Sequence, residues 1–201
     1  TASRLIGSFG YFLEPIILTS ALTYCGYKNN FIVTEYGIIS GFVMPLLLLP
    51  SFFTLAISQA LLPIISKATS RKQYTYAKKK VKQAIMISLL IGIPASGALF
   101  IFPEFFLKLI YNTNEGANYM RFLAPVCILQ YIQAPLSASL DAMGLAKANL
   151  KTTIIGTIIR TGSLLLLSLL NIGMWGLIFA TSLNVIFTTF YDYIQVKKEL
   201  K

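Results

Sequence analysis

Two ionisable residues, Glu14 and Arg160, lie inside long apolar stretches of this 201-residue chain. Glu14 follows Arg4 by ten positions and Arg160 follows Lys151 by nine, and both basic residues stand at the start of an apolar stretch. At 1.5 Å per residue, the two side chains are expected roughly 14–15 Å along membrane-spanning helices, near the midplane. A lone arginine at that depth costs about 2.5–3.5 kcal/mol. Equal depth and opposite charge therefore predict that Glu14 and Arg160 form an ion pair.

This predicted pair has two interpretations. A structural ion pair would only set the register of two helices, whereas intramembrane ionisable residues usually mark a substrate or ion pathway. Pro15 removes a backbone donor beside Glu14 and could open the helix at that point. We favour a functional pair, and the structural alternative stays open.

Uncharged polar and small residues recur at steps of three and four in four apolar stretches, which places each set on one helix face. Close helix packing explains the small and hydroxyl residues. An unpaired amide costs more free energy to bury than an unpaired hydroxyl. For the glutamine and asparagine residues, helix packing and a shared polar cavity are therefore about equally good explanations. The faces are Ser3, Gly7, Gly10 and Glu14; Ser51, Thr54, Ser58 and Gln59; Gln130, Gln133, Ser137 and Asp141; and Thr181, Asn184, Thr188 and Asp192. The candidate cavity residues are Glu14, Gln59, Gln130, Gln133, Arg160 and Asn184.

Residue types that catalyse reactions or bind metals are scarce. The sequence has no histidine, which is the commonest general base and a common metal ligand. Cys25 and Cys127 lie about a hundred positions apart, so they form no metal or redox motif. The carboxylates do not cluster, and the hydrophilic segments are too short to hold a catalytic site. We therefore expect a protein that is not an enzyme and that holds no metal and no cofactor.

The composition places the chain in a membrane. Apolar residues make up 56% of the sequence and charged residues 12%, whereas a soluble domain has about 25% charged residues. The net charge of +10 does not indicate a nucleic-acid partner, because the basic residues lie between the apolar stretches. We expect an all-α integral membrane protein. A chain that starts at Thr1, at the mouth of a span, is also expected to be a fragment whose upstream part is missing.

Six apolar stretches are long enough to span a bilayer, which requires about 20 residues. Proline is tolerated in a spanning helix where neighbouring groups satisfy the freed carbonyls. We therefore expect the prolines to kink helices rather than to end them. The six spans are expected at residues 5–24, 36–62, 83–110, 122–143, 152–170 and 174–194.

A basic segment at residues 63–82 sets the expected orientation, because basic residues beside membrane spans are retained in the cytoplasm. With this segment inside, 13 of the 17 basic residues are cytoplasmic, three are outside and Arg160 lies within a span. We therefore expect both termini in the cytoplasm. The segment is also expected to contact anionic lipids, at about 1 kcal/mol per basic residue. Its seven basic residues are Lys67, Arg71, Lys72, Lys78, Lys79, Lys80 and Lys82.

Three segments resemble the C-terminal half of oligosaccharide flippases. They are GYFLEPIILTSALTYCGY, EYGIISGFVMPLLLLPSFFTLAISQALLPIIS and SLDAMGLAKANLK. The first two are similar to the first two spans of that half, and the third is similar to the turn after its fourth span. The resemblance covers nearly the whole chain. It indicates the multidrug/oligosaccharidyl-lipid/polysaccharide (MOP) flippase superfamily, and within it the stage V sporulation protein B group.

The resemblance implies a transporter of two six-helix lobes around a central cavity, in the manner of MATE and MOP proteins. This chain would be the C-terminal lobe, and its partner would be the missing N-terminal lobe. Members of the superfamily move lipid-linked sugars or cationic drugs by alternating access. Some lipid II flippases have a sodium site on the first and fifth spans of this lobe. Here those spans carry Glu14 and Arg160, so we do not carry the sodium site over.

The preferred hypothesis is a transporter lobe that flips an undecaprenyl-linked saccharide or cell-wall precursor across the bacterial cytoplasmic membrane. The amides would bind the sugar, and Arg160 would bind the pyrophosphate. The main alternative is a multidrug or cation exporter of the same superfamily, which would favour acidic cavity residues. A membrane-embedded transferase is less favoured because catalytic residues are lacking. A non-transporting scaffold is less favoured because it gives the two midplane charges no role.

Overall fold

The computed structural model describes the backbone of residues 2–200 and the side chains of residue 8 and residues 10–200. The predicted positions Ser3 and Gly7 on the first polar face lie outside the described side chains. All regular elements of the described part are helical, in agreement with the all-α prediction. The helices are α1 (Ala2–Tyr24), α2 (Asn29–Ile38), the π-helix η1 (Ile39–Val43), α3 (Met44–Leu48), α4 (Ser51–Ser70), α5 (Tyr74–Ile101), α6 (Pro103–Tyr111), α7 (Ala117–Ala142), α8 (Ala146–Ser168) and α9 (Trp175–Glu199).

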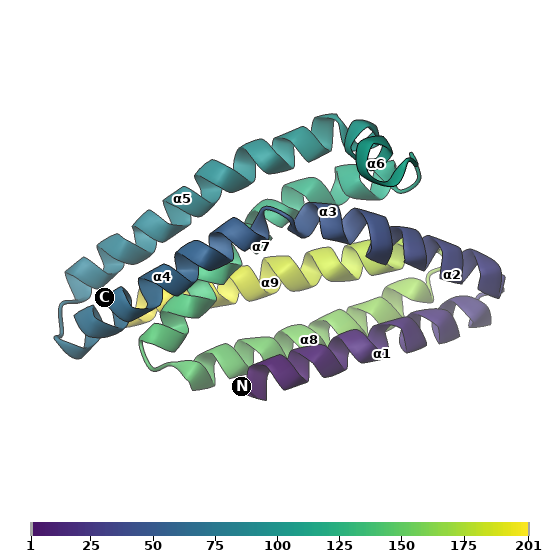
Figure 1. Cartoon of the computed structure of the whole chain (residues 1–201). Helices are drawn as coiled ribbons and strands as arrows, with labels where there is room; N and C mark the ends of the chain where they lie inside the picture. Colours follow the sequence, from purple (N-terminus) through teal and green to yellow (C-terminus); the bar gives the residue numbers. More distant parts are fainter. Residues whose placement is uncertain (1, 201) are drawn as a thin grey trace.

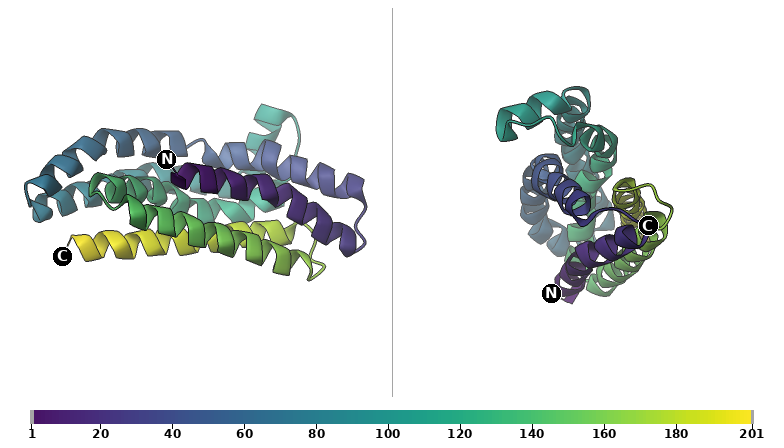
Figure 2. Two further views of the ribbon diagram at one scale, coloured as in Figure 1. Left: turned by 90° about the horizontal axis from the view of Figure 1, so that it is seen from below. Right: turned by 90° about the vertical axis from the view of Figure 1, so that its right-hand side faces the viewer.

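The long helices run roughly parallel or antiparallel in an elongated bundle (Figures 1 and 2). One end carries the turn between α4 and α5, the turn between α7 and α8, and the C-terminus; we call it the basic end (Figure 1). The opposite end carries α6 and the turns that join α1 to α2 and α8 to α9 (Figure 1). α7 packs against α4, α5 and α9, and α8 packs between α1 and α9.

Within the described residues, six helices are long and apolar enough to cross a membrane. α2, η1 and α3 together form the first of these, and α4 continues from them end to end, so the two make one pass along the bundle. α1, which matches the first predicted span, lies beside α8 and supplies a further pass. The chain therefore passes along the bundle six times. The six helices are Asn29–Leu48, Ser51–Ser70, Tyr74–Ile101, Ala117–Ala142, Ala146–Ser168 and Trp175–Glu199.

The second pass is longer and more broken than the predicted span 36–62. It includes a π-helix just before Pro45 and a turn at Leu49–Pro50. Each proline lacks the N–H that would continue the helical ladder. The carbonyl of Leu46, four residues before Pro50, accepts the amide of Leu49 at 3.3 Å, and the neighbouring carbonyl of Leu47 accepts the hydroxyl of buried Tyr131 at 2.7 Å. A side chain of α7 therefore makes the break tolerable.

The third predicted span, 83–110, is also wrong in its bounds. α5 begins at Tyr74 and ends at Ile101, and Pro103 starts the separate short helix α6. Proline suits the first turn of a helix, because the N–H groups there have no intrahelical partner. The predicted basic loop 63–82 is therefore mostly helix, and only residues 71–73 form the turn between α4 and α5. The other four predicted spans correspond to α1, α7, α8 and α9, with ends shifted by up to several residues.

Two glycines allow α8 to approach both neighbours closely. A Cβ atom on Gly10 of α1 would lie 2.6 Å from Thr157 Cγ2. A Cβ atom on Gly156 of α8 would lie 2.6 Å from Thr188 Cγ2 and 2.9 Å from Asn184 Oδ1. Small residues at such positions allow helices to pack at short range in a membrane. This packing brings the polar faces of α1, α8 and α9 together.

Candidate substrate cavity

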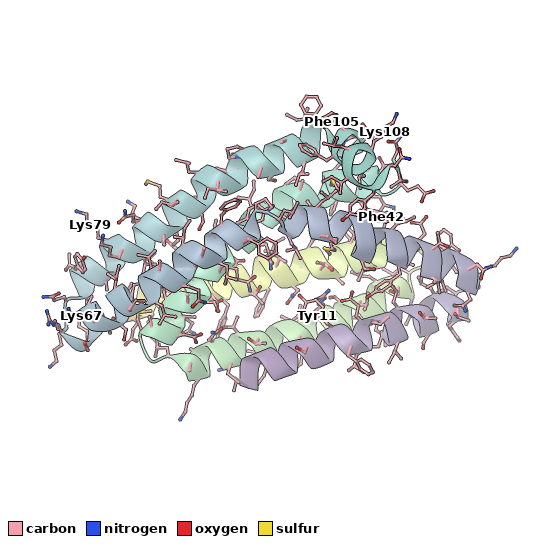
Figure 3. The ribbon with its side chains drawn as sticks, viewed as in Figure 1. Tyr11, Phe42, Lys67, Lys79, Phe105 and Lys108 are labelled. Atoms are coloured by element: carbon pink, nitrogen blue, oxygen red, sulfur yellow. The ribbon has the colours of Figure 1, made fainter. Side chains whose placement is uncertain are left out.

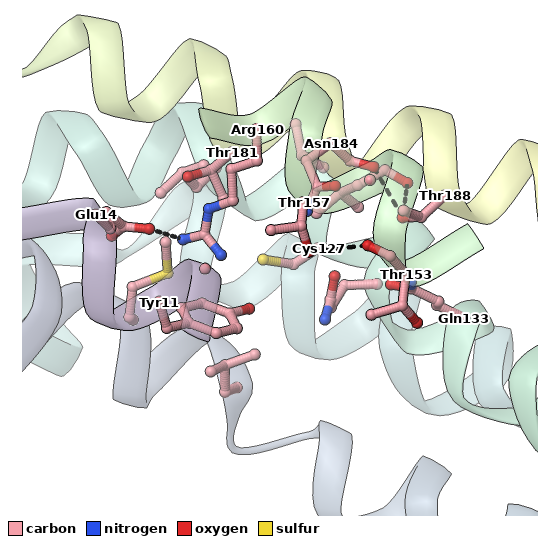
Figure 4. Close-up of a pocket in the computed structure, with 18 of the residues that line it drawn as sticks. Tyr11, Glu14, Cys127, Gln133, Thr153, Thr157, Arg160, Thr181, Asn184 and Thr188 are labelled. Carbon is pink, nitrogen blue, oxygen red and sulfur yellow. Dashed lines mark hydrogen bonds and ion pairs between the residues drawn. The ribbon is translucent and has the colours of Figure 1, made fainter. Parts of the chain in front are cut away.

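A cavity of about 410 Å³ lies between α1, the α2–α3 segment, α7, α8 and α9 (Figure 4). Its polar lining comes mainly from α7, α8 and α9, while the α2–α3 segment adds mostly apolar side chains. Polar side chains on facing helices inside a bundle are a common arrangement for ligand sites. Five of the six predicted cavity residues line it, namely Glu14, Gln130, Gln133, Arg160 and Asn184.

The predicted ion pair between Glu14 and Arg160 is present. Nη2 of Arg160 on α8 contacts Oε2 of Glu14 on α1 (Figure 4). The two side chains are only 11% and 9% exposed, respectively. The guanidinium also lies over the ring of Tyr11, with Cζ 4.2 Å from the ring centroid. The close approach of α1 and α8 at Gly10 and Thr157, one turn away, holds the pair together.

Arg160 keeps capacity to bind a ligand despite this pairing. Its Nε atom is buried and has no hydrogen-bond partner among the described residues. A guanidinium presents five N–H donors, of which a single carboxylate uses only some. On the other side of the pair, Tyr36 of α2 lies close enough to interact with Glu14. The cavity therefore contains a cation that is oriented by one carboxylate and one aromatic ring.

The amide residues come from two helices. Gln130 and Gln133 project from α7, and Asn184 projects from α9 towards α8. The Oδ1 atom of Asn184 is buried and has no hydrogen-bond partner in the described part of the chain. The hydroxyl of Thr188 donates to the main-chain carbonyl of Asn184 at 2.8 Å and therefore does not satisfy the side-chain amide (Figure 4).

Gln59 does not belong to the cavity. It is exposed on α4 and is not among the lining residues. α4 lies beyond the break at Leu49–Pro50, and none of the residues of α4 lines the cavity. The prediction placed Gln59 on one face of the second span with Ser51, Thr54 and Ser58. Thr54 and Ser58 are buried, whereas Gln59 is exposed.

One buried carboxylate of the cavity was not among the predicted site residues. Asp192 of α9 lines the cavity and is 1% exposed. It stands eight residues after Asn184, on the same helix face, so helical spacing was the signal that could have selected it. Tyr11 and Tyr36 were also missed, because an aromatic residue in a membrane span carries no pattern that separates cavity from packing.

A hydrogen-bonded chain lies beside the cavity towards the basic end. Ser137 donates to Asn149 at 3.0 Å, and Asn149 donates to Asp141 at 2.9 Å. These residues join the end of α7 to the start of α8. Ser137 and Asn149 line the cavity, whereas Asp141 is exposed outside it.

The predicted basic segment lies at the ends of α4 and α5. Lys67 and Lys79 project outward at the basic end (Figure 3). Six of the seven basic side chains are exposed, and Lys80 is partly buried. Lys80 lies 5.6 Å from the ring centroid of Tyr76 and donates to Gln83 at 3.2 Å. None of these seven basic residues lines the cavity, so they have no part in that site.

Comparisons with known proteins agree with the resemblance seen in the sequence. A family model described as MatE matches residues 11–166. Stage V sporulation protein B of Bacillus subtilis (strain 168) is 32% identical over 201 residues, which cover 100% of this chain and 39% of that protein. Sporulation protein YkvU of the same strain is 27% identical over 202 residues, covering 100% of this chain and 45% of that protein.

A third relative, lipid II flippase MurJ of Bacillus subtilis (strain 168), is 25% identical over 170 residues. This match covers 81% of the chain and 30% of the relative. The chain thus spans less than half the length of each of these relatives. No solved structure gives a significant match.

Proposed function

The chain belongs to the MatE family of the MOP transporter superfamily, and we propose that it forms one lobe of a flippase for a lipid-linked oligosaccharide or cell-wall precursor. In two-lobe transporters the substrate site lies near the midplane at the interface of the lobes. The proposal therefore requires a second, N-terminal lobe as the partner of this chain. Lipid II flippase MurJ, one of the relatives, supports a lipid-linked substrate.

The observation that carries the proposal is the cavity that combines one buried guanidinium with several amides. Arginine binds phosphate through a planar fork of N–H groups, which suits a pyrophosphate. Gln130, Gln133 and Asn184 offer both donors and acceptors, which suit sugar hydroxyl and amide groups. An undecaprenyl-linked saccharide contains both kinds of group.

Alternating access requires a lobe that can change shape or tilt around the site. The π-helix at residues 39–43 and the turn at Leu49–Pro50 interrupt the second pass, and π-bulges and proline breaks are the usual places where helices bend. Ile39, Ser40 and Leu48 beside these interruptions line the cavity. We propose that bending of this pass changes access to the cavity.

We propose a location in the bacterial cytoplasmic membrane, with both termini and the basic end in the cytoplasm. The proposal follows from the asymmetric distribution of basic residues between the two ends of the bundle. The exposed basic side chains on α4 and α5 would then contact the anionic lipids of the inner leaflet.

A second candidate function is export of organic cations. It is favoured by one specific observation, because the cavity contains two carboxylates, Glu14 and Asp192, against one guanidinium, Arg160. A cationic ligand would interact with the carboxylates and with the rings of Tyr11 and Tyr36. The flippase proposal remains the first choice, since Glu14 is already paired with Arg160.

The experiment that tests the flippase proposal measures flipping in proteoliposomes that contain the whole protein with both lobes. The substrate is undecaprenyl-diphosphate-linked N-acetylglucosamine labelled with a fluorophore that an added reductant quenches in the outer leaflet. We expect Gln130→Ala and Gln133→Ala to slow flipping about tenfold, the effect of losing roughly 1.4 kcal/mol of binding. Gln83→Ala is the matched control, because Gln83 is exposed on α5 and does not line the cavity.

Two outcomes would contradict the proposal. Wild-type protein that leaves the labelled lipid in its original leaflet is not a flippase for this class of lipid. Wild-type protein that instead exports ethidium from loaded vesicles would support the cation exporter.

A further inference from the structure

The face of α9 that meets α8 carries a row of hydrogen-bond acceptors. Asn184, Thr188 and Asp192 follow one another at steps of four residues, so their side chains lie on one side of the helix. All three line the cavity. At 1.5 Å per residue, Asn184 and Asp192 are about 12 Å apart along the helix axis. The row therefore extends from the middle of the cavity towards the basic end.

Two members of this row lack a donor. Oδ1 of Asp192 and Oδ1 of Asn184 are both buried without a hydrogen-bond partner among the described residues. Asp192 is 1% exposed, and Thr152 of α8 interacts with its carboxylate without satisfying Oδ1. A buried carboxylate oxygen without a donor is unfavourable. Because both residues line the cavity, a ligand bound there would supply the missing donors.

Among the residues whose side chains the structure describes, no basic residue lines this end of the cavity. Arg160 is the basic residue of the cavity lining, and it stands eight residues after Thr152 on α8, or about 12 Å along the axis. The charged residue that interacts electrostatically with Asp192 is another carboxylate, Asp141 of α7. The cavity is therefore polarised, with donors at Arg160 and acceptors at Asp192.

We propose that Asp192 and Asn184 form a subsite for the hydroxyl and amide N–H groups of a sugar headgroup, separate from the phosphate-binding position at Arg160. This inference rests on the proposed flippase function. It adds to that function the direction in which the lipid-linked sugar lies in the cavity. A diphosphate at Arg160 lies near mid-depth, and the first sugar extends two helical turns towards the basic end. The separation of about 12 Å leaves room for a sugar ring between the two positions.

A purely structural role for Asp192 makes a different prediction. If its carboxylate served only to hold α9 against Thr152, its loss would weaken folding and would affect every ligand equally. A subsite for sugar donors affects only ligands that carry the sugar. Ligand selectivity therefore separates the two roles.

The test compares two lipids as probes of the whole protein in detergent. One is undecaprenyl diphosphate, and the other is undecaprenyl-diphosphate-linked N-acetylglucosamine; binding of each is measured by native mass spectrometry. We expect Asp192→Asn to weaken binding of the sugar-bearing lipid about tenfold, as for loss of a hydrogen bond to a charged group. Binding of undecaprenyl diphosphate is expected to change less than twofold. Arg160→Gln is expected to weaken binding of both lipids.

Glu199→Gln is the matched control, because Glu199 is an exposed carboxylate on the same helix. Asn184→Ala is the second variant in case Asp192→Asn does not fold, and it is expected to give the same selectivity with a smaller loss. An equal loss for both lipids, or no loss for either, overturns the subsite. Wild-type protein that binds the two lipids with the same affinity also overturns it and leaves the phosphate position intact. Wild-type protein that binds neither lipid overturns the proposed function itself.

Discussion

The hydroxyl of Tyr131 donates to the main-chain carbonyl of Leu47 at 2.7 Å, across the contact between α7 and the second pass. Tyr131 is fully buried, and its ring packs where a Cβ atom on Gly92 of α5 would lie only 2.5 Å away. The tyrosine therefore connects three passes at the level of the break at Leu49–Pro50. This bond stabilises a bent segment that also lines the cavity.

The first prediction concerns this bond. Tyr131→Phe leaves the ring and removes the donor, so the Leu47 carbonyl is left buried without a partner. We expect a loss of about 1–3 kcal/mol in stability, measured by thermal unfolding in detergent. Tyr24→Phe is the control and should have little effect, since Tyr24 is 86% exposed. Equal melting temperatures for Tyr131→Phe and wild type would show that the bond does not stabilise the bend.

The second prediction concerns the contact between α8 and α9. Gly156→Ala places a Cβ atom 2.6 Å from Thr188 Cγ2, and the branched threonine cannot move aside without shifting its helix. We expect this overpacking to lower the free energy of unfolding by about 1–3 kcal/mol. It should also push α8 and α9 apart where Gly156 meets Asn184. Gly162→Ala on the same helix meets nothing within 4 Å and should be neutral or slightly stabilising. The melting temperatures of the two variants are compared by thermal unfolding in detergent. A Gly156→Ala variant that is more stable than Gly162→Ala would contradict the close packing of α8 on α9.

The ion pair was predictable from the sequence because depth in a membrane follows from residue counting along a helix. α1 and α8 are unbroken between their basic residues and the pair, so counting from Arg4 and Lys151 predicted that Glu14 and Arg160 lie at one level, and the two side chains do pair. Five of the six predicted cavity residues line one cavity for the same reason. The positions at which helices break could not be predicted in this way, because helical spacing does not specify them.

The breaks in the second and third passes could not be predicted from the prolines themselves. Pro15 and Pro94 lie inside continuous helices, whereas Pro50 stands in a turn and Pro103 starts a new helix. The difference depends on tertiary partners such as the Tyr131 hydroxyl, which no local pattern specifies. Once the turn at Pro50 is formed, α4 runs clear of the cavity, and Gln59 with it.

The third prediction concerns orientation. We expect the basic end in the cytoplasm and the opposite end outside, because basic residues favour the inner side. Single cysteines at Ser70 and Asn114, in a background without Cys25 and Cys127, are treated with a membrane-impermeant maleimide in intact cells. Labelling at Asn114 but not at Ser70 is expected. The opposite pattern would reverse the topology.

The fourth prediction concerns the chain by itself. The proposed function places the substrate between two lobes, so this chain alone should insert in a membrane but should not flip lipid. Gln130, Gln133 and Asn184 line a cavity and are partly exposed in this chain alone, so without the second lobe they would meet lipid or a second copy. Unpaired amides are unfavourable in hydrocarbon. The proteoliposome assay with the purified 201-residue chain checks this. Flipping by the monomeric chain at the rate of the whole protein would show that no second lobe is needed.

The last prediction concerns the pair of Glu14 and Arg160. Breaking a buried ion pair from one side leaves an uncompensated charge and costs up to about 3–5 kcal/mol, whereas removal of both charges is often neutral. A carboxylate can be neutralised by a proton, but a guanidinium cannot lose its charge in this way. We therefore expect Glu14→Gln to lower the melting temperature more than Arg160→Gln does, and the double variant to recover most of the loss.

A double-mutant cycle in the whole protein separates a structural pair from a functional one. Thermal unfolding in detergent reports the coupling, and additive losses would show that the two side chains do not interact in the membrane protein. Flipping in proteoliposomes reports function. The double variant is expected to regain stability and to remain inactive, because the guanidinium that binds phosphate is gone. A stable double variant that flips lipid at the wild-type rate would reduce the pair to a packing element, since neither charge would then be required for transport.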